Sequence, residues 1–208
     1  MKKSVSLKLI VFTLLLVTAN ITYSEDPEFK KGSGQDSTVA GVASDASGGK
    51  SSAFGYNSLA TGSNSLAAGY KNTANGKSSS SVGWQNSAEG DYASAFGYFN
   101  KAYEHRSSAF GSNNTASGEW SSAFGINNTA SGKRSSAFGN QNRASGIESS
   151  VFGSEYQVTG EHSGAFGVGN ATFHTATNQY KYYYINEGNG SYMIGNFNKI
   201  ASGSNDNF

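Results

Sequence analysis

Apolar and small residues recur along most of this chain with a period of 14 residues. The phrase Ser-Ser-Ala-Phe-Gly occurs at 107–111, 121–125 and 135–139, and Ser-Ser-Val-Phe-Gly follows at 149–153. A second phrase, Ala-Ser-Gly, lies between the copies. Each period therefore predicts two short strands separated by turns. A fixed short period indicates a solenoid, in which each repeat is one coil that its neighbours help to bury.

Glycine occupies two fixed positions of the period and extends the repeat well beyond the clean copies. The first column consists of Gly41, Gly55, Gly69, Gly83, Gly97, Gly111, Gly125, Gly139, Gly153 and Gly167. The second consists of Gly48, Gly62, Gly76, Gly90, Gly118, Gly132, Gly146 and Gly160, and Glu104 and His174 interrupt it. Glycine at a fixed offset indicates a positive φ or a close approach of two chain segments. We therefore expect an all-β roll of about 11 coils over residues 37–208, with two straight sides of about five residues per coil.

Alternation of side chains along a strand separates the alanines of the repeat from the phenylalanines. A coil of 14 residues encloses a narrow interior that suits small residues, so we expect the alanines inside and the phenylalanines outside. An exposed apolar stripe of this length calls for a partner, and a symmetric homo-oligomer supplies one. The reverse assignment, with phenylalanines inside, needs no oligomer and stays open here. The predicted interface residues are Phe54, Phe96, Phe110, Phe124, Phe138, Phe152 and Phe166.

The repeat is interrupted near the C-terminus, at residues 170–190. Gly167 and Gly195 are two periods apart, whereas residue 181 between them is lysine. Two β-prone runs flank Asn189-Gly190, a hairpin signal, so we expect either a degenerate coil or a projecting hairpin. Its role would be to cap the last open edge or to offer a tyrosine-rich contact surface.

The N-terminus has the pattern of a secretory signal peptide, for which we predict residues 1–24. Lys2 and Lys3 precede an apolar run over 9–17, and small residues follow. A membrane anchor is the alternative, but a spanning helix needs about 20 apolar residues. Residues 25–36 are a polar lead-in, and the rest is one domain.

Composition and charge narrow the possible functions. The chain has no cysteine and a formal net charge of +1, with acidic and basic residues scattered singly, which argues against nucleic-acid binding. His105, His162 and His174 show no metal-ligand spacing, and no catalytic constellation or cofactor motif is present. We therefore expect no enzyme, metal, cofactor or small-molecule substrate. A β-helical acyltransferase, the enzyme alternative, has a six-residue period that 14 does not contain.

A binding function is expected at repeat positions that vary. One ladder lies eight and nine residues after each Ala-Phe-Gly glycine, and a second ladder follows the glycine directly. Solvated turn residues or further oligomer contacts are the alternative interpretation of both ladders. The candidate ligand-binding residues are Tyr56, Tyr70, Trp84, Tyr98, His105, Arg106, Trp120, Lys133 and Arg134.

The repeated Ser-x-Ala-Φ-Gly and Ala-Ser-Gly phrases, where Φ is a bulky apolar residue, resemble the YadA-like head repeats of trimeric autotransporter adhesins, over about residues 37–203. The resemblance implies a left-handed parallel β-roll, a homotrimer, and an exported protein at the Gram-negative cell surface that binds host extracellular-matrix or cell-surface molecules. This chain departs from the family in its phenylalanine Φ column, and no heptad stalk or anchor segment is visible in it. The alternative function is a structural or surface-active roll, such as an ice-binding or coat protein, although the threonines form no regular ladder.

Overall fold

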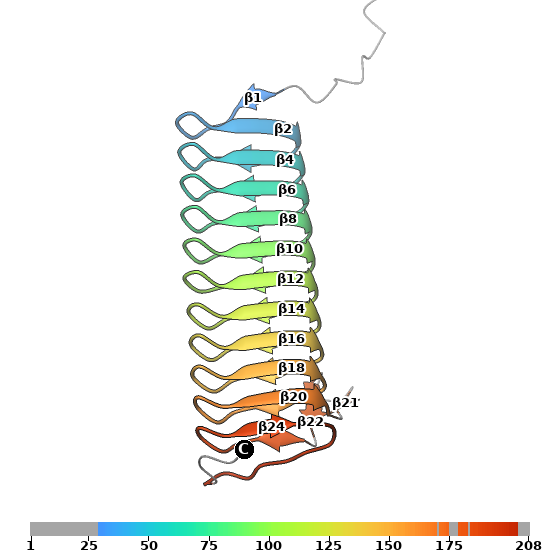
Figure 1. Cartoon of the computed structure of the whole chain (residues 1–208). Helices are drawn as coiled ribbons and strands as arrows, with labels where there is room; N and C mark the ends of the chain where they lie inside the picture. The colour runs from blue at the N-terminus through green and yellow to red at the C-terminus, as the bar shows by residue number, and fades with distance from the viewer. Residues whose placement is uncertain (1–28, 170, 175–178, 183, 204–208) are drawn as a thin grey trace, which may run out of the picture.

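The computed structural model describes residues 29–169, 171–174, 179–182 and 184–203. The predicted signal peptide, residues 1–24, lies outside this part of the chain. All regular elements of the described residues are β-strands, and they form a column of stacked coils (Figure 1). The all-β solenoid expected from the glycine columns is therefore confirmed.

Two parallel sheets run along the column, one of long strands and one of short strands. The long strands are β2 (Thr38–Val42), β4 (Ser52–Tyr56), β6 (Leu66–Tyr70), β8 (Ser80–Trp84), β10 (Ser94–Tyr98), β12 (Ser108–Ser112), β14 (Ser122–Ile126), β16 (Ser136–Asn140), β18 (Ser150–Ser154), β20 (Gly164–Val168) and β24 (Tyr192–Ile194). The short strands are β3 (Asp45–Ala46), β5 (Leu59–Ala60), β7 (Thr73–Ala74), β9 (Ser87–Ala88), β11 (Lys101–Ala102), β13 (Thr115–Ala116), β15 (Thr129–Ala130), β17 (Arg143–Ala144), β19 (Gln157–Val158) and β23 (Ile185–Asn186).

Each strand pairs in register with its equivalent one period away, for example Phe110 with Phe124. Eleven long strands in parallel and ten short strands alternate in the described chain, which gives ten complete coils and the first strand of another. The count is slightly below the expected 11. The two sides of a coil also differ in length, because the second strand has two residues rather than about five.

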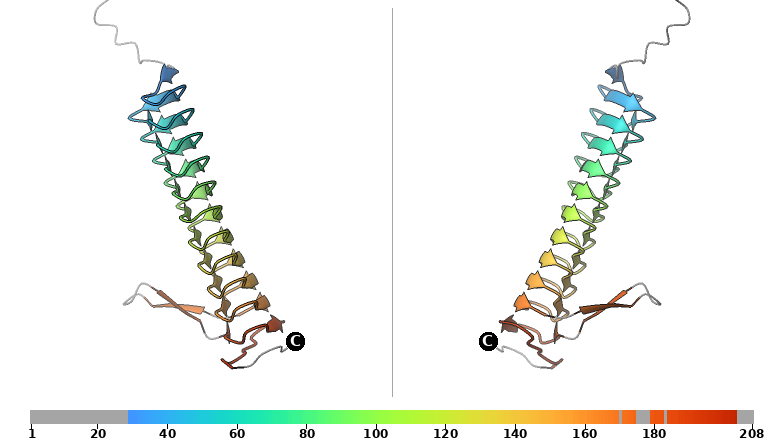
Figure 2. Two further views of the ribbon diagram at one scale, coloured as in Figure 1. Left: turned by 90° about the vertical axis from the view of Figure 1, so that its left-hand side faces the viewer. Right: turned by 90° about the vertical axis from the view of Figure 1, so that its right-hand side faces the viewer.

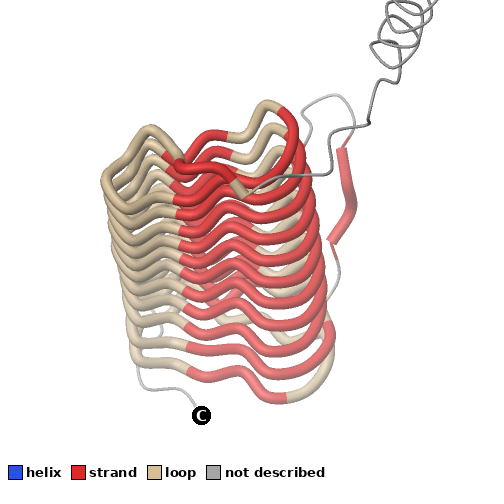
Figure 3. The backbone as a smooth tube through the Cα atoms, turned by 90° about the horizontal axis from the view of Figure 1, so that it is seen from above, coloured by secondary structure: helices blue, strands red, loops and turns tan. Residues whose placement is uncertain are grey.

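Alanine fills the interior of the roll, as predicted. Ala109 and Ala116, which face each other from the two sides of one coil, are both fully buried, and the same holds for their equivalents along the column. The view down the column shows the coils stacked directly on one another, so equivalent positions recur along the column (Figure 3). The assignment with phenylalanine inside is therefore wrong, because that interior has no space for the ring.

Buried asparagines form a second internal ladder at the turn after each long strand. Each Nδ2 donates to the carbonyl oxygen four residues earlier and, at 2.7 Å, to a glycine carbonyl eleven residues later. Each Oδ1 accepts the backbone N–H of the equivalent residue in the next coil. The ladder therefore connects backbone groups of one coil with backbone groups of the next, and the buried amides are themselves hydrogen-bonded. Its members are Asn72, Asn86, Asn100, Asn114, Asn128 and Asn142.

The glycine columns serve the stacking of coils rather than the corners themselves. Gly125, a member of the first column, lies inside β14 with φ of +115°, and a Cβ there would overlap the carbonyl oxygen of Gly139. Gly132, in the second column, has no positive φ, but its Cβ would overlap Gly146 of the next coil in the same way. The left-handed corner residues are mostly not glycine, for example Asn127 and Arg134. Both columns therefore need glycine because two chain segments approach closely there. This is one of the two reasons expected from the fixed spacing of glycine.

The two ends of the column are finished differently. At the N-terminal end, β1 (Lys30–Lys31) pairs antiparallel with β2 and covers its free edge. Near the C-terminal end, β21 (Ala171–His174) and β22 (Gln179–Tyr182) form an antiparallel hairpin that projects sideways from the column (Figure 2). The strands that flank Asn189-Gly190 do not form the hairpin expected there.

The roll resumes after the hairpin because the insertion is one period long. β23 pairs with β19 and β24 with β20, each at an offset of 28 residues. The buried Tyr156 replaces asparagine in the internal ladder at this point. Its Oη donates to the carbonyl oxygen of Gly195, 2.9 Å away, and accepts the N–H of Asn198 at 3.1 Å. This hydroxyl therefore ties the last coil to the roll.

Candidate binding surfaces

The predicted interface residues form one column on the outer face of the long sheet. From Phe96 to Phe138 the rings stack with centroids 4.8–5.0 Å apart and planes within 8° of parallel. They are half-buried by each other, and Phe152 and Phe166 are 55% and 57% exposed. Phe54 lies in the same column, where Phe29 contacts it edge-on at 6.0 Å. The structure thus presents a continuous apolar stripe outside the roll.

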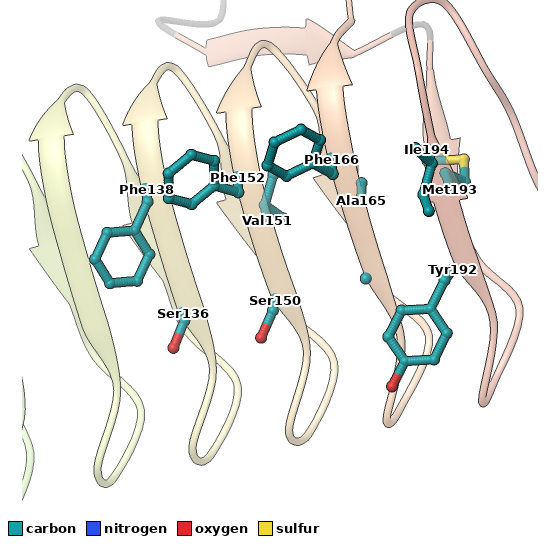
Figure 4. A pocket seen from close by; sticks show the side chains of 11 residues that line it. Ser136, Phe138, Ser150, Val151, Phe152, Ala165, Phe166, Tyr192, Met193 and Ile194 are labelled. Carbon is teal, nitrogen blue, oxygen red and sulfur yellow. The ribbon is translucent and has the colours of Figure 1, made fainter.

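A hollow of about 660 Å³ lies at the C-terminal end of this stripe (Figure 4). Phe138, Phe152 and Phe166 line one part of it, and Tyr192 and Ile194 of β24 line the other. Gly164 occupies the position at which most other long strands carry serine, and a Cβ there would meet the ring of Tyr192. Tyr192 was not predicted to belong to the apolar stripe, although its 28-residue offset from Gly164 is visible in the sequence.

The second predicted ladder lies on the same outer face as the phenylalanines. Tyr56, Tyr70 and Trp84 end consecutive long strands, and their rings stack at 5.3 Å and 3.9 Å. Tyr98, one coil further, leaves this stack and packs edge-on against Phe99 at 4.5 Å. The stacked rings of Tyr70 and Trp84 lie on the two strands whose Φ residues, Ala68 and Val82, are smaller than phenylalanine. The two columns therefore complement each other along a single apolar face.

The remaining candidates lie in the loops that lead from short to long strands, at the left-hand edge of the column in Figure 1. Arg106 and Trp120 occupy equivalent corner positions 14 residues apart, and Tyr92 precedes them in the series. The Arg106 Cζ lies 5.6 Å from the centroid of the Tyr92 ring and 4.5 Å from that of the Trp120 ring. His105 contacts both rings, with centroids 5.6 Å and 6.3 Å away. Three of these residues, His105, Arg106 and Trp120, were predicted from the sequence, whereas Tyr92 was not, although it has the same spacing.

The backbone makes this corner an unfavourable place for aromatic residues. Tyr92 and Trp120 have φ of +60° and +65°, a region in which a bulky residue costs about 1–2 kcal/mol. Asn64, at the equivalent position of an earlier coil, is the residue type that tolerates this backbone best. Each exposed cation–π contact with Arg106 contributes only about 0.5–1 kcal/mol. The stacking therefore does no more than offset the strain.

Ion pairs bind the neighbouring coils at the same corner. Lys133 Nζ lies 2.7 Å from Glu119 Oε2, and Arg134 Nη1 lies 2.7 Å from Glu148 Oε1. The hydrogen bond from Lys133 lowers the pKa of Glu119, with a further contribution from the Trp120 indole N–H. The hydrogen bond from Arg134 similarly lowers the pKa of Glu148, which also lies 3.4 Å from His162. Lys133 and Arg134 are therefore already neutralised within the chain.

The predicted ligand surface is thus two separate surfaces. The aromatic ladder at the ends of the long strands shares the face of the phenylalanine column, whereas the corner ladder precedes the same strands. Within the part of the chain that the structure describes, no group of three or more metal-ligating side chains is found. The described residues also contain no helix long and apolar enough to cross a membrane.

Comparison with known families agrees with this architecture. The YadA head domain repeat matches this chain in overlapping copies over residues 33–58, 60–86, 74–100, 88–114, 102–128, 116–142 and 130–155. A search of curated proteins finds no match. The matched copies cover more than half of the chain and follow its 14-residue coils, and the alanine interior and parallel register fit such a repeat. The chain therefore belongs to the YadA-like head repeat family of trimeric autotransporter adhesins.

Proposed function

We propose that this chain is an exported adhesin head that forms a homotrimer through the phenylalanine face and attaches to host extracellular-matrix or cell-surface molecules. The observation that carries the proposal is the stacked phenylalanine column, which lies outside the roll in a single chain. Family membership supports an adhesin-like role at a cell surface and supplies the number of subunits.

The magnitude of the apolar stripe favours association. Fully burying a phenylalanine contributes about 1.5–3 kcal/mol, and these rings are already about half-buried in the column. Seven rings per chain therefore offer on the order of 5–10 kcal/mol before the costs of association. The stacked Tyr56, Tyr70 and Trp84 extend the same face toward the N-terminal end, and the hollow beside Phe166 would receive side chains of a neighbouring copy.

Sedimentation equilibrium of the purified chain tests the assembly. We expect a trimer for the wild type, and a folded monomer when Phe110, Phe124 and Phe138 are all replaced by serine. A matched control carries Thr115→Ser and Thr129→Ser on the outer face of the short sheet, and it should remain trimeric. A wild type that stays monomeric at micromolar concentration contradicts the proposed interface.

Attachment is tested separately, with the trimer displayed on a non-adherent bacterium. We expect the displayed trimer to retain cells on matrix-coated surfaces or cultured host cells, and the triple serine variant to lose most of this retention because avidity is lost. Failure of the wild-type trimer to attach to any of these surfaces would contradict the adhesive role and favour a structural one.

A further inference from the structure

The corner formed by Tyr92, Arg106 and Trp120 holds a cation between two aromatic rings. The guanidinium of Arg106 is exposed and lies between two aromatic rings. Among the described residues, its recorded interactions are these two ring contacts, and no carboxylate lies within ion-pair distance. The rings therefore restrain the position of the guanidinium while its N–H donors face solvent.

Neighbouring basic residues of the same ladder lack this property. Glu119 pairs with Lys133, and Glu148 pairs with Arg134, so both cations have acidic partners inside the chain. Glu119 also accepts the indole N–H of Trp120 at 3.0 Å and thereby holds one of the two rings. Arg106 is thus a cation restrained by aromatic rings and without an acidic partner among the described residues, whereas Lys133 and Arg134 are paired.

The strained backbone indicates that these side chains are not explained by the fold alone. The corner positions require a left-handed conformation, which asparagine adopts readily and tyrosine and tryptophan adopt only at a cost. Since the stacking contacts no more than offset that cost, local stability gives no net reason for two aromatic residues here. Their exposed surfaces, 46% for Tyr92 and 44% for Trp120, remain available for contact with a ligand.

We propose that this corner binds a carboxylate-bearing sugar, and that Arg106 is the residue that recognises its carboxylate. A guanidinium matches the two oxygens of a carboxylate with two parallel hydrogen bonds. The flanking rings offer flat apolar surfaces to the C–H groups of a sugar ring, and His105 adds a polar group beside them. This inference deepens the proposed adhesive function and rests on it, because it names the class of host molecule.

A peptide fits this corner less well. The adjacent strands β10, β12 and β14 are each paired on both sides, so no free strand edge is available for an extended peptide. The hollow at the C-terminal end of the phenylalanine stripe does not include Arg106. A shallow, exposed site with two ring surfaces suits a single sugar unit. A host surface that displays many such units would engage the three copies of the site in the trimer, and this multivalency would raise the overall affinity.

Binding of the wild-type trimer to glycan polymers by biolayer interferometry tests this proposal. The probes are polymers that bear sialyllactose or glucuronate, a sulfated polymer without carboxylates, polyglutamate, and a polymer that bears neutral lactose. We expect binding to a carboxylate-bearing polymer and none to neutral lactose. Arg106→Gln should weaken this binding at least tenfold, and Arg106→Lys should weaken it severalfold because the charge remains but the paired donors are lost. Lys50→Gln is the matched control, because Lys50 is an exposed cation at the equivalent corner of an earlier coil where no aromatic ring of the described residues is stacked on it, and it should change binding less than twofold.

Each alternative result contradicts the proposal in its own way. Equal binding of acidic and neutral polymers, or unchanged binding by Arg106→Gln, would remove Arg106 from recognition. Arg106-dependent binding of the sulfated polymer alone, or of polyglutamate alone, would show that the ligand is not a carboxylated sugar. If the displayed wild type and Arg106→Gln attach equally to host surfaces, this inference fails while the adhesive function stands. Circular dichroism and sedimentation confirm that each variant is a folded trimer.

Discussion

The internal asparagine ladder gives the sharpest test of how this roll is held together. In Asn114→Ala, the fully buried side chain is removed together with its hydrogen bonds to the carbonyl oxygens of Phe110 and Gly125, at 2.8 Å and 2.7 Å, and to the N–H of Asn128, at 2.9 Å. A buried polar group that loses its partner costs about 1–3 kcal/mol. Three such groups give a loss of at least about 3 kcal/mol, or roughly 6–12 °C in melting temperature for a domain of this size.

Thermal unfolding followed by circular dichroism measures this effect, at one fixed protein concentration because oligomers melt at concentration-dependent temperatures. The matched control is Asn75→Ala, since the exposed Asn75 does not have a left-handed backbone, accepts one hydrogen bond from Thr61 Oγ1 at 2.8 Å, and should lose about 0.5 kcal/mol or less. Asn114→Ser should lie between the two, because serine replaces asparagine at the equivalent Ser58 and bonds to the next coil at 3.2 Å. Equal melting temperatures for the two alanine variants would refute the reasoning.

Three further changes test other parts of the structure. Gly125→Val should destabilise the roll by more than an ordinary surface change, since a β-branched residue is strained at positive φ and its Cβ meets the next coil; melting at the wild-type temperature would contradict this. The pKa of Glu148 is lowered in the folded chain because Arg134 stabilises the ionised carboxylate. The free energy of unfolding should therefore decrease as the pH drops from the ordinary carboxyl pKa near 4.5 through this lowered pKa. Glu148→Gln should remove this contribution when melting temperatures are compared across that pH range. Tyr156→Phe should speed amide exchange in the last coil, where the hydroxyl accepts from Asn198, and unchanged exchange there would show that the hydroxyl is dispensable.

The repeat made much of the fold predictable from sequence. Each coil carries an alanine directly before a phenylalanine, as at Ala109 and Phe110, and strand alternation points the two side chains to opposite faces. A narrow coil accepts only the smaller of the two, so the alanine interior and the outward phenylalanines could be predicted. The register also followed, because a coil can stack on its neighbour in only one way when glycine must meet glycine at each close approach.

Other features depend on contacts between coils that a single period does not reveal. Asn114 and its equivalents recur every 14 residues, but an asparagine next to a turn ordinarily indicates an exposed residue, and only the stacked neighbours show its buried partners. A degenerate coil or a projecting hairpin was expected over residues 170–190, and the local turn signal is strongest at Asn189-Gly190. Parallel pairing of β23 and β24 with the preceding coil overrides that local preference.

The direction of the hydrogen bonds between coils has a mechanical consequence. Strands stack along the column, so these bonds lie nearly parallel to its long axis, and β2 and β24 lie at opposite ends of it (Figure 1). Tension between the two ends would load the coils in series and detach them one at a time. Each coil of 14 residues would release roughly 40 Å of extended chain, given a rise of about 3.3 Å per residue and a stacking distance of about 4.8 Å. A pulled head would thus lengthen in equal steps and absorb work at every step, as a shock absorber does.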